Sequence, residues 1–336
     1  MEYTLQQDFS ALPAAEWNSL LAEAISDVPF LRHEYLSAWW QSRGGGEWTQ
    51  AALVLVSARE DGRLIGIAPL FKAEHQGRAA LLLLGSLEIS DYLDVIVRPE
   101  DLPRFLAGLL DFLDRSGLTA GTAYDWYNLP DSSPTLAALK AEAEKRGWTY
   151  TEEVYHPTPR IKLAGDFEAY LASIDKKQRH EIRRKMRRAA EGATPLRFRI
   201  VQDGASLDAE MGALFELMGQ DSEKASFLTE AMRAQLLASA RLAHVNGYLW
   251  LAFLEVDGAR AACTLNFDYR NKLWGYNSGV NRDFNDLSPG WVLLGHVIRW
   301  ACEHGRYEYD FMRGDEEYKY RFGAVDRFVM RARLTP

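Results

Sequence analysis

Residues 273–323 read LWGYNSGVNRDFNDLSPGWVLLGHVIRWACEHGRYEYDFMRGDEEYKYRFG, and this stretch decides the fold. Its first part, Leu273–Val280, is a run typical of a β-strand. Ser288, Pro289 and Gly290 then have the residue types of a helix start, with Ser as the N-cap and Pro in the first turn. The apolar residues that follow recur at helical spacing, which predicts a buried helix face made of Leu294, Val297, Ile298 and Ala301.

This helix is expected to end at Gly305, and Tyr307–Met312 reads as a second strand. The first amide N–H groups of a helix have no intrahelical partners, and a helix that begins after a strand can offer them to an anion. A glycine among them lets a ligand approach the backbone. We therefore expect a cofactor site at the helix start, with an ordinary capped helix as the alternative; its residues are Ser288, Pro289, Gly290 and Trp291.

Two Asp-Gly hairpin signals, Asp61-Gly62 and Asp257-Gly258, lie 196 residues apart. Each joins two strand-like runs, and each is followed by a further strand, a helix and another strand. The joined runs are Ala51–Ala58 with Leu64–Phe71, and Tyr248–Val256 with Ala261–Asp268. The repeated order predicts an α+β fold of two similar domains, each a mostly antiparallel mixed sheet flanked by helices.

We place the boundary of the two domains at His156–Pro159, where two prolines disfavour regular structure, which gives domains of 1–156 and 157–336. The other strands of the first domain are expected over Ala79–Leu84, Leu93–Val97, Tyr124–Leu129 and Thr149–Tyr155. Its helices are expected over Pro13–Ile25, Phe30–Trp40, Leu102–Arg115 and Pro134–Arg146. In the second domain, helices before the hairpin are expected over Phe167–Ile174, Asp175–Gly192, Ser206–Gly219 and Thr229–Ala243.

Length and composition favour a globular protein of two domains or one large domain, with 336 residues of which 47% are hydrophobic. No apolar run approaches the roughly 20 residues that a membrane-spanning helix needs. The N-terminus has no basic segment typical of a signal peptide, so a cytoplasmic protein is expected. Two cysteines, Cys263 and Cys302, exclude a disulfide framework, and the histidines show no metal-binding spacing; no metal is expected.

The charge is distributed unevenly. The segment Lys176–Arg188 holds eight Lys/Arg and one Glu, so it carries +7 while the rest of this chain of net charge −8 carries −15. This favours one anionic partner and no general binding of DNA. An apolar stripe of Ile182, Met186, Ala189 and Ala190 predicts that the helix packs on the protein. Beside it, Arg179 and Arg183 are candidates to contact a phosphorylated ligand, and a solvated charged face is the alternative.

The arrangement resembles the GNAT acyltransferases, and in particular the branch of Fem-type aminoacyl transferases and CelD-like acetyltransferases, in which two such domains lie in tandem. The motif SPGWVLLGHVIRWACEHGRYEYDFMRGDEEYKYRFGA resembles the pattern of that branch, and PFLRHEYLSAWW and SDYLDVIV agree with it. The resemblance implies acetyl-CoA or another acyl-CoA as donor substrate, bound by the second domain. Two features depart from it: residues 283–287, DFNDL, replace the usual pyrophosphate loop, and the coiled-coil arm of some Fem-type enzymes is missing, which makes use of tRNA less expected.

The resemblance also implies roles for residues of the late motif. Lys319 matches the lysine that would stabilise the developing oxyanion, and Asp310, Arg313 and Asp315 belong to the same polar cluster. The alternative is a surface loop held by ion pairs, which would contribute little to stability. Alternation places Asp310 on the face of its strand opposite to Tyr309, where a buried carboxylate needs a partner such as Arg313.

Two further pairs complete the predicted site. Asn277 and Ser278 would line the slot for the donor, at the point where their strand leaves the helix start. Asp91 and Tyr92 would contact the acceptor amine, with Asp91 as a possible proton acceptor, although an Asp at a turn is equally ordinary.

We expect an N-acyltransferase that moves an acyl group from a thioester to a small-molecule or nucleotide-linked amine. One alternative is an aminoacyl transferase that uses charged tRNA, which the basic helix favours. A second alternative is a non-catalytic binding module with the same fold.

Overall fold

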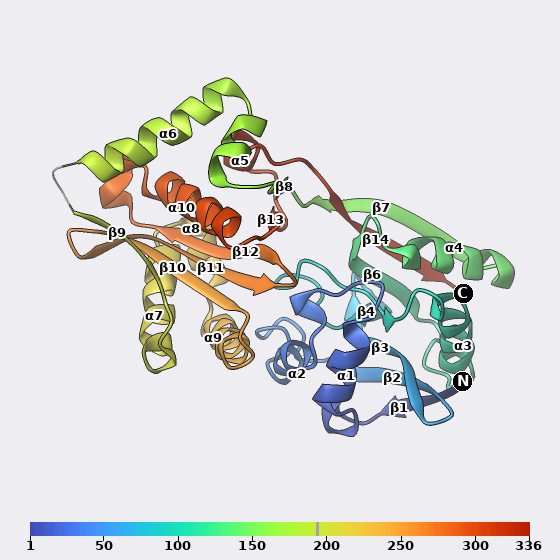
Figure 1. The fold of residues 1–336 in the computed structure, drawn as a ribbon. Helices are drawn as coiled ribbons and strands as arrows, with labels where there is room; N and C mark the ends of the chain where they lie inside the picture. Colours follow the sequence, from blue (N-terminus) through green and yellow to red (C-terminus); the bar gives the residue numbers. More distant parts are fainter. Residues whose placement is uncertain (193–194) are drawn as a thin grey trace. The chain divides into compact units, whose positions relative to one another are not determined.

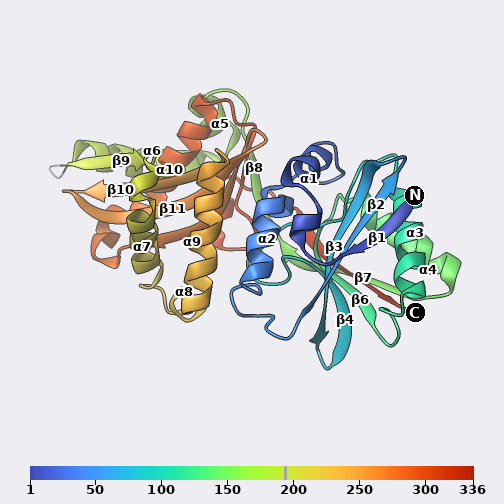
Figure 2. The ribbon, with the colours of Figure 1, turned by 90° about the horizontal axis from the view of Figure 1, so that it is seen from below.

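The computed structural model describes residues 1–192 and 195–336 (Figure 1). Contacts divide the chain into two compact units. The first unit comprises Met1–Pro157 together with Phe328–Pro336, and the second comprises Thr158–Arg327. Each unit is a mixed β-sheet with helices packed on it (Figures 1 and 2). Among the described residues, no helix combines the length and the apolar character needed to cross a membrane.

The sheet of the first unit has the strand order β1-β2-β3-β4-β6-β14-β7, and β5 pairs with β3. All neighbours are antiparallel except β4 and β6, which are parallel. The strands are β1 (Glu2–Gln6), β2 (Ala52–Glu60), β3 (Arg63–His75), β4 (Arg78–Leu83), β5 (Ile96–Val97), β6 (Ala123–Pro130), β7 (Thr149–Pro157) and β14 (Phe328–Thr335). The helices are α1 (Ala14–Leu21), α2 (His33–Gln41), α3 (Leu102–Arg115) and α4 (Pro134–Arg146). Figure 2 shows α1 and α2 on one side of these strands and α3 and α4 on the other.

The sheet of the second unit has the order β8-β13-β12-β11-β10-β9, and β12 and β13 are its parallel pair. The strands are β8 (Arg160–Lys162), β9 (Leu196–Ile200), β10 (Leu249–Val256), β11 (Ala259–Tyr269), β12 (Lys272–Val280) and β13 (Glu308–Asp310). The helices are α5 (Phe167–Ser173), α6 (Lys176–Glu191), α7 (Leu207–Met218), α8 (Ser222–Phe227), α9 (Glu230–Val245), α10 (Pro289–Glu303) and α11 (Glu317–Arg321). Helices α5, α6 and α10 cover one face, and α7 and α9 cover the other (Figure 1).

The predicted repeat is confirmed, because both units contain the same hairpin and the same parallel strand–helix–strand segment. At both hairpins the Asp and the Gly have positive φ angles: 50° and 79° at Asp61-Gly62, and 51° and 78° at Asp257-Gly258. This backbone matches the twist of two antiparallel strands, which explains the Asp-Gly sequence. The parallel segments are β4-α3-β6 in the first unit and β12-α10-β13 in the second.

Three predictions on the elements are corrected by the structure. The fourth strand of the first unit, expected over Leu93–Val97, is limited to β5, because residues 84–95 form a loop. The predicted second domain, 157–336, included β14, which instead pairs with β6 and β7 of the first unit. Ala190 of the predicted apolar stripe is exposed, whereas Ile182, Met186 and Ala189 are buried. The position of β14 could not be predicted from residue patterns, because they do not show with which sheet a strand pairs.

Candidate functional site

Two parallel neighbours of the second sheet separate after a short pairing. Residues Lys272–Trp274 of β12 pair with Glu308–Asp310 of β13, and β12 then continues to Val280 while β13 has ended. A register shift in the pairing of β11 and β12 leaves Tyr276 without an opposite residue. Such a bulge bends its strand and is common beside functional sites. A wedge therefore opens between the second half of β12 and the chain that follows β13.

A cavity of about 330 Å³ lies in this wedge. Its apolar wall is formed by α10 and by the chain after β13, through Leu293, Leu294, Val297, Phe311 and Phe322. Its polar side is formed by two strands and two flanking segments, through Lys224, Thr264, Ser278, Glu316 and Tyr318. An apolar cavity with a few polar groups on one side is the usual form of a small-molecule site.

The start of α10 forms one end of the cavity. Pro289 occupies the first helical turn, as predicted, but Ser288 does not cap the helix through its side chain. An N-cap serine needs an extended backbone to reach the following amides, and Ser288 is left-handed, with φ of 52°. The first-turn amides of Gly290 and Trp291 have no intrahelical acceptor and are not capped by Ser288.

Gly290 and Trp291 both line the cavity. A Cβ atom added at Gly290 would lie 3.0 Å from Cγ2 of Val280, so glycine allows α10 to begin close to β12. The Trp291 indole N–H is buried and has no hydrogen-bond partner among the described residues. Its ring lies 4.8 Å from the ring of Phe322, and the ammonium of Lys185 lies 4.2 Å above it.

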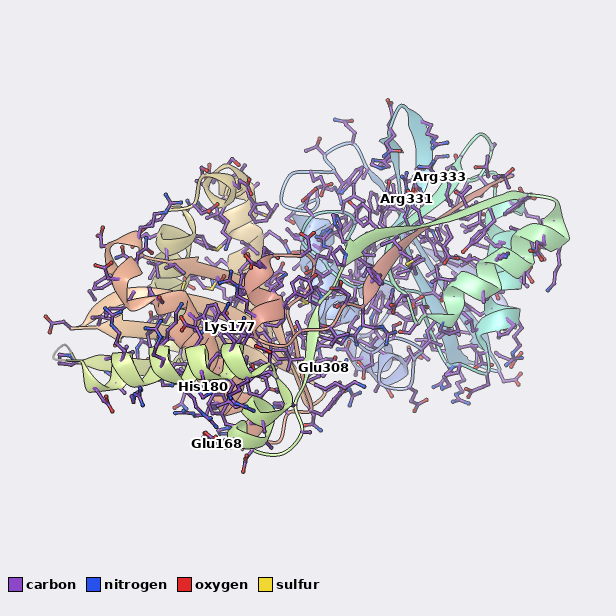
Figure 3. The ribbon with its side chains drawn as sticks, turned by 90° about the horizontal axis from the view of Figure 1, so that it is seen from above. Glu168, Lys177, His180, Glu308, Arg331 and Arg333 are labelled. Atoms are coloured by element: carbon purple, nitrogen blue, oxygen red, sulfur yellow. The ribbon has the colours of Figure 1, made fainter. Side chains whose placement is uncertain are left out.

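The basic helix α6 therefore approaches this end of the cavity through Lys185, a residue that the sequence analysis did not single out. The arginines that it did single out contact α5 instead. Arg179 donates to the carbonyl oxygens of Leu171 and Ala172, and Arg183 forms an ion pair with Glu168. Figure 3 shows Glu168 on α5, with Lys177 and His180 on α6. Neither arginine lines the cavity.

Lys319 is buried, with 2% of its surface exposed, and it does not line the cavity. Its ammonium donates to the carbonyl oxygens of Arg313 and Gly314 at 2.9 and 3.0 Å and pairs with the carboxylate of Glu316 at 2.8 Å. These three acceptors match its three donors. Lys319 thus holds the loop that carries Glu316 to the cavity.

The other polar residues of the late motif differ in burial and in their contacts. Asp310 is buried at 1% exposure, and its carboxylate accepts a hydrogen bond from the backbone N–H of Met312 at 2.8 Å. Arg313 contributes its carbonyl oxygen to Lys319, and Asp315 is exposed. As alternation predicts, Tyr309 lies on the face of β13 that lines the cavity and Asp310 does not line it.

The predicted pair on β12 is divided by the pleat of the strand. Ser278 lines the cavity, opposite Thr264 of β11, which lines it too. Asn277 does not line it, because successive side chains of a strand point to opposite faces.

Lys224 on α8 is the cavity residue that the sequence analysis missed. Its ammonium donates to the carbonyl oxygen of Ser278 at 2.7 Å, and burial lowers its pKa. The local sequence marks the start of α8 through Asp221, which accepts bonds from the N–H groups of Glu223 and Lys224. Nothing near Lys224 in the sequence indicates its contact, because Ser278 lies 54 residues away.

In the first unit, Asp91 and Tyr92 are buried, at 8% and 3% exposure, in the loop 84–95. Asn128 of β6 donates to the carbonyl oxygens of Leu87 and Ser90 in that loop, at 3.3 and 2.8 Å. This loop follows β4, which corresponds to β12 of the second unit, and it is bonded to β6 through Asn128.

Comparison with known proteins agrees with this architecture. Residues 176–320 match the family model described as an acetyltransferase (GNAT) domain. No curated protein is similar enough in sequence to match the chain. Among solved structures, FemX aligns with a TM-score of 0.66 at 13% identity, over 98% of this chain and 97% of its own. L-PGS from Bacillus licheniformis aligns with a TM-score of 0.58 at 12% identity, over 95% and 91%.

A tandem GNAT protein from the clavulanic acid biosynthesis pathway aligns with a TM-score of 0.50 at 13% identity, over 98% of this chain and 97% of its own. Likeness at such identities concerns the fold. The two units, each with its hairpin and parallel strand–helix–strand segment, form a tandem GNAT fold of the Fem-like type, as the sequence predicts.

Proposed function

From a tandem GNAT, Fem-like fold with one GNAT acetyltransferase domain in its second unit, we propose an N-acyltransferase that moves an acyl group from an acyl-CoA-type thioester to an amine. The observation that carries the proposal is the cavity in the wedge between β12 and β13, which ends at the uncapped amides of α10. Backbone amides at a helix start attract phosphate, and a narrow, largely apolar slot suits the thioester arm of such a donor.

In this proposal the second unit binds the donor. Gly290 and Trp291 hold its phosphates through their amides, and Ser278 lines the slot for its arm. The amine nitrogen attacks the thioester carbonyl, the C–N bond forms, and the C–S bond breaks to release the thiol. The enzyme accelerates this step by aligning the two substrates and by removing a proton from the amine.

The acceptor is proposed to be a small or nucleotide-linked amine. Acetyl-CoA is the simplest donor. Lys319 and Asp310 stay candidates for catalytic roles, and the candidates for contact with the substrate are Arg313, Asp315, Arg179 and Arg183.

A direct test is the release of free thiol from acetyl-CoA and longer acyl-CoA donors in the presence of a broad panel of amines. Gly290→Val should reduce thiol release at least tenfold, because its side chain would enter the contact between α10 and Val280. Gly212→Ala on α7 is the matched control, because a Cβ there meets nothing within 4 Å. Absence of thiol release from every donor and amine pair would contradict the proposal.

A second candidate is aminoacyl transfer from charged tRNA. It is favoured by the likeness to FemX and by the exposed cations of α6, which are Lys176, Lys177, Arg183, Arg184, Arg187 and Arg188. Binding of tRNA should then weaken steeply between 50 and 200 mM salt, as phosphate contacts do. Transfer from acyl-CoA without measurable tRNA binding would exclude this candidate.

A further inference from the structure

Lys224 is the one lysine among the described residues that line the cavity. It lies in α8, whose first turn is held by the Asp221 carboxylate through bonds to the N–H groups of Glu223 and Lys224 at 3.1 Å. Its ammonium donates to the carbonyl oxygen of Ser278 at 2.7 Å. The amine is therefore held against β12, at the polar side of the cavity.

The two neighbouring lysines differ in how their nitrogen atoms are bonded. Lys319 has three acceptors, two carbonyl oxygens and the carboxylate of Glu316. Lys224 has one hydrogen-bond acceptor among the residues described, the oxygen of Ser278. When the lysine amine is neutral, it still has N–H groups and can keep its hydrogen bond to the carbonyl oxygen. Its lone pair can then accept a proton.

The charges around Lys224 come from several elements. Burial lowers its pKa and is the largest effect, while Asp221, Cys263 and Glu316 act to raise the pKa and Lys319 acts to lower it. Glu316 is the one carboxylate among the described residues that line the cavity, and it is paired with Lys319 at 2.8 Å, so its charge is already balanced. Burial thus favours the neutral form of the Lys224 amine, which is the form that can accept a proton.

We propose that Lys224 is the proton acceptor of the acyl transfer, which rests on the function proposed above. The neutral Lys224 amine takes a proton from the attacking amine as the C–N bond forms. The resulting ammonium then gives that proton to the sulfur as the C–S bond breaks. One thioester and one amine thus yield one amide and one thiol, and Lys224 returns to its neutral form.

The test compares Lys224→Arg, Lys224→Met and Lys224→Ala with the wild type. Arginine keeps a positive charge and a donor for Ser278 but does not accept a proton near neutral pH. The kcat of Lys224→Arg should fall about 100-fold or more, while CoA binding, measured calorimetrically, should stay within about twofold. Added alkylamines should restore part of the activity of Lys224→Ala, increasingly with amine basicity. Circular dichroism melting identifies any variant that does not fold.

Two results separate this inference from the proposed function. If the wild type neither binds CoA nor releases thiol, the proposed function fails. The inference is wrong if the wild type releases thiol, the kcat of Lys224→Arg stays within tenfold of the wild-type value, and added alkylamines do not raise the activity of Lys224→Ala. Lys224 then contributes only its charge or its hydrogen bond to Ser278. The pH profiles of kcat give a further comparison. If the wild-type kcat rises with pH through one ionisation and the kcat of Lys224→Met does not show that ionisation, the result supports the proton transfer.

Discussion

Lys319 illustrates at the scale of one residue how a motif position can act through the backbone. Its ammonium holds the carbonyl oxygens of Arg313 and Gly314. Lys319→Met leaves both half-buried carbonyl groups without this donor, and we expect the free energy of unfolding to fall by about 3 kcal/mol. Urea denaturation measures the loss.

The control for this change is Lys177→Met, at an exposed position of α6 (Figure 3). It removes the same charge and should alter the unfolding free energy by less than about 0.5 kcal/mol. An equal effect of both variants would show that Lys319 has no special structural role.

His296 gives a prediction on pH at the same scale. Burial, with a smaller effect of Arg299, lowers the pKa of His296 to about 4. The unfolded chain, with an ordinary histidine pKa near 6.5, then binds a proton more readily, so stability is lost as the pH falls from about 6.5 to 4. The rings of His296 and Phe198 are stacked with their centroids 5.1 Å apart, and His296→Phe keeps this stacking. The variant should lose up to about 3 kcal/mol less unfolding free energy than the wild type as the pH falls.

Urea denaturation at pH 8, 6.5, 5 and 4 measures this effect as the difference between the wild type and His296→Phe. The difference should change with pH only below about 6.5. A difference that stays constant over the whole range would mean that His296 titrates alike in the folded and unfolded chains.

At the scale of elements, the site depends on how closely α7 packs on β12. A Cβ atom at Gly279 of β12 would lie 2.6 Å from the backbone C of Leu217 and from the backbone N of Met218. Backbone cannot move aside as a side chain can, so Gly279→Ala should lower the unfolding free energy by about 2 kcal/mol. Thermal or urea denaturation tests this expectation.

Gly212→Ala is the matched control on α7, where a Cβ meets nothing within 4 Å. Alanine is the better helix former, so this variant should gain about 0.5–1 kcal/mol. Opposite signs for the two glycines are the expected outcome, and a gain in stability for Gly279→Ala would contradict the close packing.

At the scale of the whole molecule, the last strand returns to the first unit. Arg331 and Arg333 of β14, labelled in Figure 3, donate to the buried carboxylate of Asp125 at 2.8 and 2.9 Å. A chain that ends at Arg327 leaves β6 and β7 without the strand between them and leaves Asp125 without both partners. We expect fast hydrogen exchange in β6 and unchanged protection in α10, as measured by mass spectrometry.

Arg331→Gln serves as the comparison for this truncation, because it keeps β14 and one of the two arginines. The rate of hydrogen exchange in β6 of this variant should lie between the rates of the full chain and of the shortened chain. If the shortened chain protects β6 as well as the full chain does, β14 is not required by the first unit.

How much the sequence predicts depends on whether the cause of a feature is local. The bounds of α3 and α4 agree with the predicted helices, because the signals for both ends are local. A proline lies in the first turn of each helix, and Ser116 or Gly147 directly follows its last residue. The prediction that the Ser288 side chain caps α10 was wrong, because the φ angle of Ser288 is set by the turn before it. Lys185 and Lys224 were missed because each is placed beside the cavity by packing between distant elements.

By itself, the sequence determined the two sheets with their Asp-Gly hairpins and the α10 segment, because repeated local patterns specify strands, turns and helices. The tandem GNAT type of fold followed from the resemblance of its late motif to that family. Only the tertiary structure decided that β14 belongs to the first unit, that Lys319 faces a loop, and that Lys224 faces the cavity. The physical reason is that the partner of a strand or of a charged side chain is chosen by packing and hydrogen bonding between segments that lie far apart in the chain.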